Sequence, residues 1–260
     1  MKIAFCFLVY DEIINEELWN TFFKNVDTEK YGIYIHYKVN KPLQYFNRYK
    51  ISNCINTKYA DISLVHAHNL LFEHALNDGC DKFINLSQSC LPFKSFNYIY
   101  DFLSKDNFSY FNIVPKTACF PNCNSLLSHY DRDFIYKSSQ WFIINREICN
   151  AFINASQENI HRFSSIYAPE EIFFITQVFL HKLDNLIITT PNLSIGATTF
   201  TNWEGMDYKF PSTKGLKNYT FISQEELDYI MNSTSLFGRK FTRDSIGCFL
   251  KNKYISFISS

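Results

Sequence analysis

Two adjacent carboxylates stand at the start of an apolar helix near the middle of the chain. Pro169, Glu170 and Glu171 run directly into the apolar stretch 172–179. Proline just inside a helix start, with acids in the first turn, is a typical N-terminal signal. The residues that follow are apolar on nearly every side, so we expect this helix to be buried. A carboxylate held rigidly at the edge of a core is suited to act as a general base.

A second interpretation of these acids requires no chemistry. Acids in a first turn interact favourably with the positive end of the helix dipole, an effect of about 0.3–1 kcal/mol for each acid at the surface. On the local pattern alone, this is the simpler explanation of Glu170 and Glu171. The choice between the two interpretations depends on the rest of the chain.

The composition limits the classes of partner. The chain has 260 residues with 25 Lys+Arg and 25 Asp+Glu, so no net charge draws it to nucleic acid or to anionic lipid. Hydrophobic residues make up 47% and there are only 7 Gly and 7 Pro, which is typical of a globular protein with a large core. Cations gather near the C-terminus, but Asp244 lies among them, and a nucleic-acid binder is not favoured.

The first residues and the apolar runs bear on the cellular compartment. The apolar run 3–10 is short and acids follow it at once, which favours a buried strand over a signal peptide. No apolar run reaches the roughly 20 residues that a membrane span needs. We therefore expect a cytoplasmic protein without a transmembrane segment, or one that is peripheral at a membrane. Cys119 and Cys123 suggest zinc by their spacing, but no second ligand pair is near them in sequence.

Strand patterns and helix patterns alternate along the chain. Strands are expected at residues 2–9, 31–37, 82–86, 141–144, 187–190 and 198–203, with a basic strand or turn at 236–241. Helices are expected at 16–24, 63–77, 96–103, from 145 to about 155, and at 169–179 and 224–231. Residues 105–137 are polar and are expected to form a long irregular excursion. This alternation predicts an α/β fold with helices on both faces of a sheet, in which ligands bind beyond the carboxyl ends of the strands.

Seven short segments form a series along the chain. They are Ile33-Tyr34-Ile35-His36, Ala60-Asp61-Ile62-Ser63-Leu64-Val65, Phe83-Ile84-Asn85-Leu86-Ser87-Gln88-Ser89-Cys90-Leu91-Pro92, Ser139-Gln140-Trp141-Phe142 with Arg146, Pro169-Glu170-Glu171, Trp203-Glu204-Gly205 and Leu236-Phe237-Gly238-Arg239-Lys240-Phe241. In this order and spacing, over nearly the whole chain, they resemble the core-2/I-branching β-1,6-N-acetylglucosaminyltransferase family, which includes peptide O-xylosyltransferase-like members.

The resemblance implies a fold and a domain organisation. The fold would be a single GT-A-type nucleotide-diphospho-sugar transferase domain over residues 1–260, with a mixed central sheet and helices on both faces. A nucleotide-binding half would cover about 1–105, and an acceptor and catalytic half would cover about 106–260.

The resemblance also implies a reaction, an inverting transfer of GlcNAc from a UDP-sugar to a saccharide hydroxyl. In relatives the second residue after the proline at this helix start is the catalytic base, and Glu171 occupies that place. One carboxylate would take the proton of the acceptor hydroxyl as that oxygen attacks the anomeric carbon. The partners implied are a UDP-sugar donor and a saccharide or glycoconjugate acceptor, with no metal and no other cofactor.

The departing diphosphate needs positive charge close to it. Many GT-A enzymes supply a divalent metal through an Asp-x-Asp step at a strand end, but this chain has Ser87-Gln88-Ser89 there, and hard cations prefer carboxylates. The one Asp-x-Asp step, Asp131-Arg132-Asp133, lies in the irregular excursion and is the alternative metal site.

Fixed cations take the place of the metal in the family that the chain resembles. Lys240, with Arg239 beside it, would be one such cation, and Lys217, or else Lys214, would be a second. The resemblance also implies nucleotide contacts by His36, His68 and Ser87, and acceptor contacts by Trp203, Glu204 and Trp141.

Simpler interpretations stay open for several of these residues. Arg239 and Lys240 would suit an ordinary basic edge strand, Trp203 a core, and His36 the end of a strand. Two alternatives also remain for the whole protein, a xylosyltransferase of the same family and an inactive carbohydrate-binding protein descended from such an enzyme. The presence of both Glu171 and Lys240 favours an enzyme.

Overall fold

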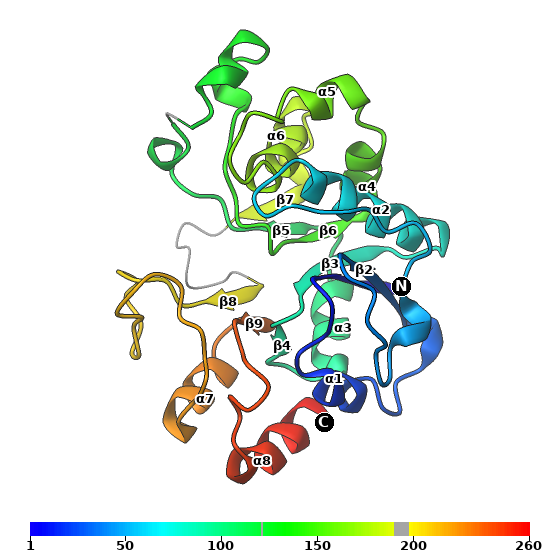
Figure 1. The fold of residues 1–260 in the computed structure, drawn as a ribbon, viewed down its shortest axis with the longest axis vertical. Coiled ribbons are helices and arrows are strands. Elements are labelled where there is room, and N and C mark those ends of the chain that lie inside the picture. The colour runs from blue at the N-terminus through cyan, green and yellow to red at the C-terminus, as the bar shows by residue number, and fades with distance from the viewer. Residues whose placement is uncertain (121, 190–197) are drawn as a thin grey trace.

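A six-stranded mixed sheet crosses the middle of the molecule (Figure 1). The computed structural model describes residues 1–120, 122–189 and 198–260. The strands lie in the order β2 (Tyr31–Tyr37), β1 (Ile3–Val9), β3 (Lys82–Ser87), β6 (Ile143–Asn145), β5 (Ser109–Phe111) and β7 (Ile187–Thr189). Strand β1 is parallel to β2 and β3, and β5 is parallel to β7, whereas β6 is antiparallel to both β3 and β5.

Strand β1 is buried on both faces and separates two cores. Ile3, Phe5 and Phe7 belong to one cluster of buried residues, whereas Ala4 and Cys6 belong to the other. This division follows from the strand geometry, because successive side chains point to opposite faces of a sheet. A near-continuous apolar run is typical of a strand that is covered on both faces.

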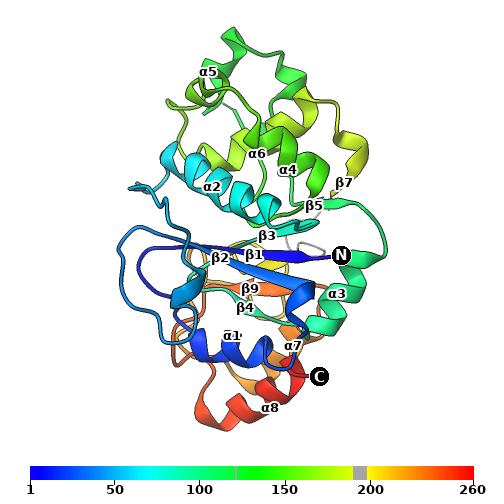
Figure 2. The same cartoon turned by 90° about the vertical axis from the view of Figure 1, so that its right-hand side faces the viewer.

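Helices cover both faces of the sheet, as Figure 2 shows and as the sequence predicts. One face carries α2 (Ser63–Asn77), α4 (Arg146–Ile153), α5 (Gln157–His161) and α6 (Glu170–Leu180). The other carries α1 (Glu16–Phe22), α3 (Phe96–Ser104), α7 (Gln224–Met231) and α8 (Cys248–Ile258). The α/β fold with a mixed central sheet is therefore confirmed.

A second, three-stranded sheet lies on the face covered by α1, α7 and α8. Its strands lie in the order β4 (Leu91–Pro92), β9 (Phe237–Arg239) and β8 (Thr199–Thr201). Strand β9 is antiparallel to β4 and parallel to β8. Backbone hydrogen bonds extend the pairing of β4 with β9 beyond both strands. Phe93 N donates to Leu236 O at 2.7 Å, and Phe241 N donates to Ser89 O at 3.0 Å. The segment after β3 is thereby joined to the C-terminal part of the chain.

The polar excursion is mostly irregular, as predicted. It contains the short 3-10 helices η3 (Lys116–Ala118), η4 (Asn124–Ser128) and η5 (Arg132–Phe134). Others are η1 (Thr28–Lys30), η2 (Asn47–Tyr49) and η6 (Asp184–Leu186). The excursion differs from the prediction at β5, because three buried residues insert between β6 and β7 and complete the sheet.

The other predicted elements agree with the structure to within a few residues at their ends. Strands β4 and β5 and helices α5 and α8 are not predicted, and the last residue of the predicted strand 187–190 lies outside the described residues. Within the described part of the chain, no helix is both long enough and apolar enough to cross a bilayer. The division into halves at about residue 105 stays a prediction.

Candidate active site

A cavity of about 380 Å3 opens beside the first turn of α6. Six of the residues singled out from the sequence line it, namely Trp141, Glu171, Trp203, Glu204, Arg239 and Lys240. The cavity lies beyond the carboxyl end of β3, because the antiparallel pairing of β6 with β3 puts the residues just before β6 at that end. This is where an α/β sheet is expected to bind its ligand.

Helix α6 presents its two acids to different surroundings. Glu171 lines the cavity, whereas Glu170 is 3% exposed and points into the protein. The helix is otherwise buried from Ile172 to Val178, as its composition predicts. Pro169 is the N-cap, and the preceding Ala168 has a φ of 53°, which turns the chain sharply into the helix. The register of this turn decides which of the two carboxylates reaches the cavity.

The Glu171 carboxylate is held by one cation. Lys137 Nζ lies 3.1 Å from Glu171 Oε2, and both side chains are about one third exposed or less. The backbone N–H of Ser138 donates to Glu171 O at 2.8 Å, so the segment before β6 is fixed to the first turn of α6. The ion pair and this backbone contact hold the carboxylate in a fixed place on the cavity wall, as a general base requires.

Two more cations face the same cavity from the end of β9. The guanidinium of Arg239 lies 4.1 Å from the centre of the Trp141 ring, a cation–π contact. Burial lowers the pKa of Arg239 and also that of Lys240, and the charge of Arg239 lowers the pKa of Lys240 further. Two like charges in one half-buried wall repel each other, and an anion bound between them would relieve that repulsion. The arrangement is suited to a phosphate group.

Exposed aromatic rings border the cavity. Trp203 is 49% exposed and Tyr59 is 89% exposed, although both are large and apolar. The ring of Tyr167 lies 6.4 Å from that of Tyr59. Aromatic faces left open to solvent beside polar groups are suited to the apolar face of a sugar ring.

Strained backbone brings the two tyrosine-bearing loops together. Ala60 and Ala168, which follow Tyr59 and Tyr167, have φ values of 54° and 53°. The N–H of Ala168 donates to Ala60 O at 3.3 Å. A left-handed conformation in a residue other than glycine costs about 1–3 kcal/mol and persists where its surroundings impose it. The wall of the cavity near Glu171 is therefore fixed by backbone contacts as well as by side chains.

Glu170 is an unusual residue in this turn because its carboxyl group is buried. Oε2 has no hydrogen-bond partner among the described residues. Burial raises the pKa of Glu170 from 4.5 to about 7, and the charges of Glu171 and Asp61 act in the same direction. Because the folded-state pKa lies above the unfolded-state value, this group favours the folded state most below pH 4.5, and that contribution is lost as the pH rises to about 7.

We expect Glu170→Gln to stabilise the folded protein at pH 8 and to change little at pH 4.5. The shift corresponds to about 3 kcal/mol in the free energy of unfolding, because the amide carries no charge to desolvate. The measurement is urea unfolding of both proteins across this pH range. Buried His36 and His68 add a slope of opposite sign, but they are present in both proteins and cancel in the difference. Equal stability at pH 8 would mean that Glu170 reaches solvent.

The three residues predicted to contact the nucleotide do not line the cavity. His36 and His68 are both 0% exposed, and burial lowers their pKa values to about 4 and about 3. His36 Nε2 accepts from the N–H of Ile55 at 2.9 Å, and the His68 ring packs against Phe174. Ser87 is 7% exposed, with its Oγ 3.2 Å from Ser89 Oγ. Their predicted contacts with the nucleotide stay predictions.

Lys217 lies in an ion pair and not on the cavity wall. Its Nζ is 2.6 Å from Glu226 Oε1, and it lies over the ring of Tyr219. Glu204 does line the cavity, but its Oε2 also accepts from the N–H of Gly215 at 2.8 Å, so it holds a neighbouring loop. Its predicted contact with the acceptor would share the carboxylate with that loop.

The alternative metal ligands are apart from the cavity. Asp133 is almost fully exposed and lies 3.4 Å from Lys116 Nζ, in the excursion. Cys119 and Cys123 are buried with their Sγ atoms 3.1 Å apart. Among the described residues, no three His, Cys, Asp or Glu side chains gather as a metal site would require.

Lys137 and Tyr59 are the site residues that the sequence analysis missed. Lys137 stands two residues before the Ser139-Gln140-Trp141-Phe142 segment, and Tyr59 stands just before the segment that begins at Ala60. The sequence signal available for both residues was their position next to segments that carry the family resemblance. A lone lysine or tyrosine in a loop carries no pattern of its own, so only the fold shows what they face.

Several known proteins that are similar to this chain are glycosyltransferases. A curated relative is glycosyltransferase BC10 of Oryza sativa subsp. japonica, 23% identical over 155 residues, which cover 56% of this chain and 39% of that protein. Solved structures with a similar course include the galactosyltransferase LgtC in complex with donor and acceptor sugar analogs, at 10% identity, 98% and 96% coverage and a TM-score of 0.46. Another is the bifunctional glycosyltransferase WbbM, at 11% identity, 92% and 45% coverage and a TM-score of 0.44.

The family assignment rests on the sequence. The family model described as "Branch: Core-2/I-Branching enzyme" matches residues 3–231, which is most of the chain. The match covers the Pro169-Glu170-Glu171 turn and the Trp203-Glu204 segment, and ends before Arg239 and Lys240. The protein belongs to the core-2/I-branching enzyme family.

Proposed function

We propose that the protein is an inverting, metal-independent glycosyltransferase of the GT-A type, which moves a sugar from a UDP-sugar to a saccharide hydroxyl. The observation that carries the proposal is the cavity, where a lysine-paired carboxylate and two cations face the same space from separate parts of the chain. This is the pairing of groups that the reaction requires, one to accept a proton and others to stabilise a departing anion.

Glu171 is the base in this mechanism. Its carboxylate takes the proton of the acceptor hydroxyl as that oxygen forms a bond to the anomeric carbon. Attack opposite the leaving group inverts the configuration at that carbon. Lys137 contacts Oε2 and leaves Oε1 without a hydrogen-bond partner among the described residues, so one oxygen holds the orientation and the other is open to the acceptor.

Arg239 and Lys240 act on the other side of the reaction. When the bond between the anomeric carbon and the diphosphate breaks, its electron pair goes to the phosphate oxygen, and negative charge grows there. The guanidinium and the ammonium lie ready to neutralise this charge, and the Trp141 ring keeps the guanidinium in place. Groups that are already oriented need no reorganisation when the charge develops.

The aromatic rim supports a saccharide as the acceptor. Trp203 and Tyr59 present open ring faces on the cavity that contains Glu171, with Glu204 beside Trp203 as a polar neighbour. We propose GlcNAc as the sugar transferred, which rests on the family, with xylose as the alternative within the same family. A panel of UDP-sugars tests this choice, with UDP release as the readout.

We expect turnover to survive EDTA. Ser87-Gln88-Ser89 stands where a metal-dependent relative would carry acids, and Gln88 Oε1 is already occupied by the N–H of Tyr10 at 2.7 Å. The measurement is UDP release with and without EDTA in excess over the divalent ions present. Loss of turnover that Mn²⁺ restores would contradict the metal-free mechanism and would direct attention to Asp131 and Asp133.

A further inference from the structure

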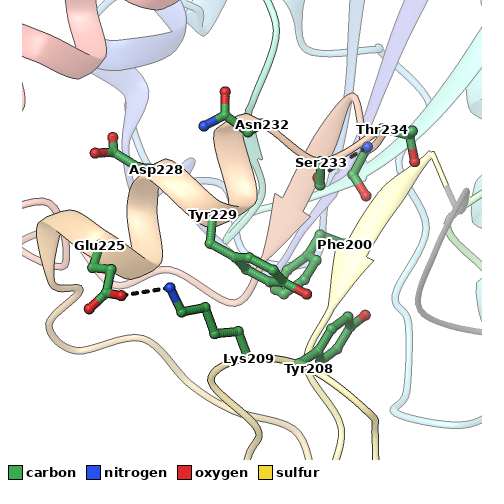
Figure 3. A pocket seen from close by; sticks show the side chains of 10 residues that line it. Phe200, Tyr208, Lys209, Glu225, Asp228, Tyr229, Asn232, Ser233 and Thr234 are labelled. Carbon is green, nitrogen blue, oxygen red and sulfur yellow. Dashed lines mark hydrogen bonds and ion pairs between the residues drawn. The ribbon is translucent and has the colours of Figure 1, made fainter.

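A second cavity lies behind strand β8, on the face opposite the catalytic cavity. Its volume is about 540 Å3, and Phe200, Tyr208 and Tyr229 are among the residues that line it (Figure 3). Thr201, the next residue of β8, lines the catalytic cavity instead. Since successive side chains of a strand point to opposite faces, β8 is a wall shared by two separate cavities.

The three rings form one continuous aromatic surface. The centres of the Phe200 and Tyr208 rings are 4.8 Å apart, and those of the Tyr208 and Tyr229 rings are 6.4 Å apart. Figure 3 shows the Tyr229 ring reaching from α7 toward the two rings on the β8 side. Phe200 and Tyr208 are fixed by burial, whereas Tyr229 is only partly buried and can offer a face to a ligand.

Polar groups without partners lie close to this surface. The hydroxyl of Tyr229, the side-chain amide of Asn232 and the hydroxyl of Thr234 make no hydrogen bond within the part of the chain that the structure describes. Asn232 and Thr234 are exposed, so water serves them in the absence of a ligand. A ring face beside several free donors and acceptors suits a ligand with one apolar face and many hydroxyl groups.

The charges around the cavity argue against an anionic ligand. Lys209 is the only cation in its lining as described, and its Nζ lies 2.6 Å from Glu225 Oε1. The Asp228 carboxylate, also in the lining, is paired with Lys253 at 2.6 Å. Among the described lining residues, no unpaired positive charge is left for a phosphate, a sulfate or a uronic acid, in contrast to the catalytic cavity with Arg239 and Lys240.

We propose that this cavity is a second saccharide-binding site, which takes neutral sugar units of a glycan chain. The ring of Tyr229 would stack on the apolar face of a sugar, and Asn232 would bond its hydroxyl groups. The volume falls in the range of ligand sites, roughly 300–1,000 Å3, which leaves room for more than one sugar ring. The site is distinct from the catalytic cavity, so the inference goes beyond the proposed function and does not depend on it.

The position of this second site suits it to hold one part of a long glycan acceptor while another part is in the catalytic cavity. The loop after β8 carries Trp203 on the catalytic side and Tyr208 on this side, and Tyr208 Oη donates to Thr201 O at 3.2 Å. A glycan held behind β8 would stay attached to the protein while another part of the chain, or another branch, reaches Glu171. A second point of attachment raises the effective concentration of the acceptor hydroxyl at the catalytic cavity.

The test is calorimetric titration of the whole protein, without nucleotide, with cellotetraose, xylotetraose and N-acetylchitotetraose. We expect at least one tetrasaccharide to bind, Tyr229→Ala to weaken that binding about tenfold, and Asn232→Ala to weaken it about threefold. Trp203→Ala removes only binding at the catalytic cavity, so the loss caused by Tyr229→Ala should be the same with and without Trp203→Ala. Tyr98→Ala, at an exposed tyrosine of α3, is the matched control and should have no effect.

Folding and catalysis are checked on the same variants. Tyr229→Phe keeps the ring and should retain most of the affinity, whereas a folding defect in Tyr229→Ala would show as a lower melting temperature. UDP affinity and transfer to a monosaccharide acceptor should be unchanged in Tyr229→Ala and Asn232→Ala.

Three results would overturn the inference. They are no binding of any tetrasaccharide, equal binding by Tyr229→Ala, and stronger binding of a sulfated saccharide than of its neutral counterpart. If the unmodified protein binds a tetrasaccharide but neither binds UDP nor transfers a sugar, only the proposed function is contradicted.

Discussion

Glu171→Gln should lower kcat roughly 10²–10⁴-fold while the fold and UDP affinity stay as they are. The amide has nearly the same shape but cannot accept the proton of the attacking hydroxyl. It also breaks the ion pair with Lys137, which both side chains can lose at little cost because they are partly exposed. The measurement is steady-state transfer, together with calorimetric titration of UDP.

The neighbouring acid provides the control for this variant. Glu170→Gln changes the same functional group one residue away, but at a buried position outside the cavity. We expect it to leave kcat within a few-fold of the unmodified protein at pH 7. If Glu170→Gln abolishes turnover and Glu171→Gln does not, the base is Glu170 and the cavity side of the helix has been assigned wrongly.

Lys240→Ala should lower kcat roughly 10²–10³-fold and weaken UDP-sugar binding by less than that. The charge on the diphosphate grows as the bond to the anomeric carbon breaks, so the ammonium contributes more in the transition state than in the complex with the donor. Lys240→Arg should recover only part of the loss in kcat, because a planar, delocalised guanidinium does not replace a compact ammonium beside Arg239. Lys105→Ala, at an exposed lysine, is the matched control and should be silent.

Ligand affinities give an independent check on the same cations. UDP should bind more tightly than UMP, and UMP more tightly than uridine, because each phosphate adds charge for Arg239 and Lys240 to neutralise. Equal affinity for UDP and uridine would mean that no cation holds the phosphates, and would favour a carbohydrate-binding protein over an enzyme. Lys217→Ala is a further variant for these titrations. If it weakens UDP binding as much as Lys240→Ala does, Lys217 must leave Glu226 to reach the nucleotide.

Elements with strong local signals were predictable from the sequence. Helices α2 and α7 have the predicted bounds, and α6 begins where Pro169 and the two acids indicate. Helix α8 has buried residues at positions 250, 254 and 258, a spacing of four that the sequence analysis overlooked. Strands β4 and β5 had no such signal, because strands of two and three residues are defined by their partners and not by their own pattern.

The site was predictable only in part, for a related reason. Glu171, Arg239 and Lys240 stand in segments that the family resemblance marks, and the structure places all three on one cavity. Lys137 and Tyr59 acquire their places from tertiary contacts, which no local pattern encodes. The burial of His68 between α2 and α6, where the resemblance implies a nucleotide contact, likewise follows from how two helices pack and not from the residue itself.

The three-stranded sheet has a consequence for the order in which activity appears during folding. It joins residues 91–92 to residues 237–238, so it closes one of the longest loops in the chain. Contacts between such distant segments form late, because the entropy of closing the loop must be lost before the contacts can compensate for it. Arg239 lies in this sheet, and Glu171 lies in a helix on the far side of the larger one. We therefore expect a partly folded chain to have the proposed base in place before the proposed cations. Recovery of catalysis after dilution from denaturant should therefore lag behind the recovery of helical circular dichroism.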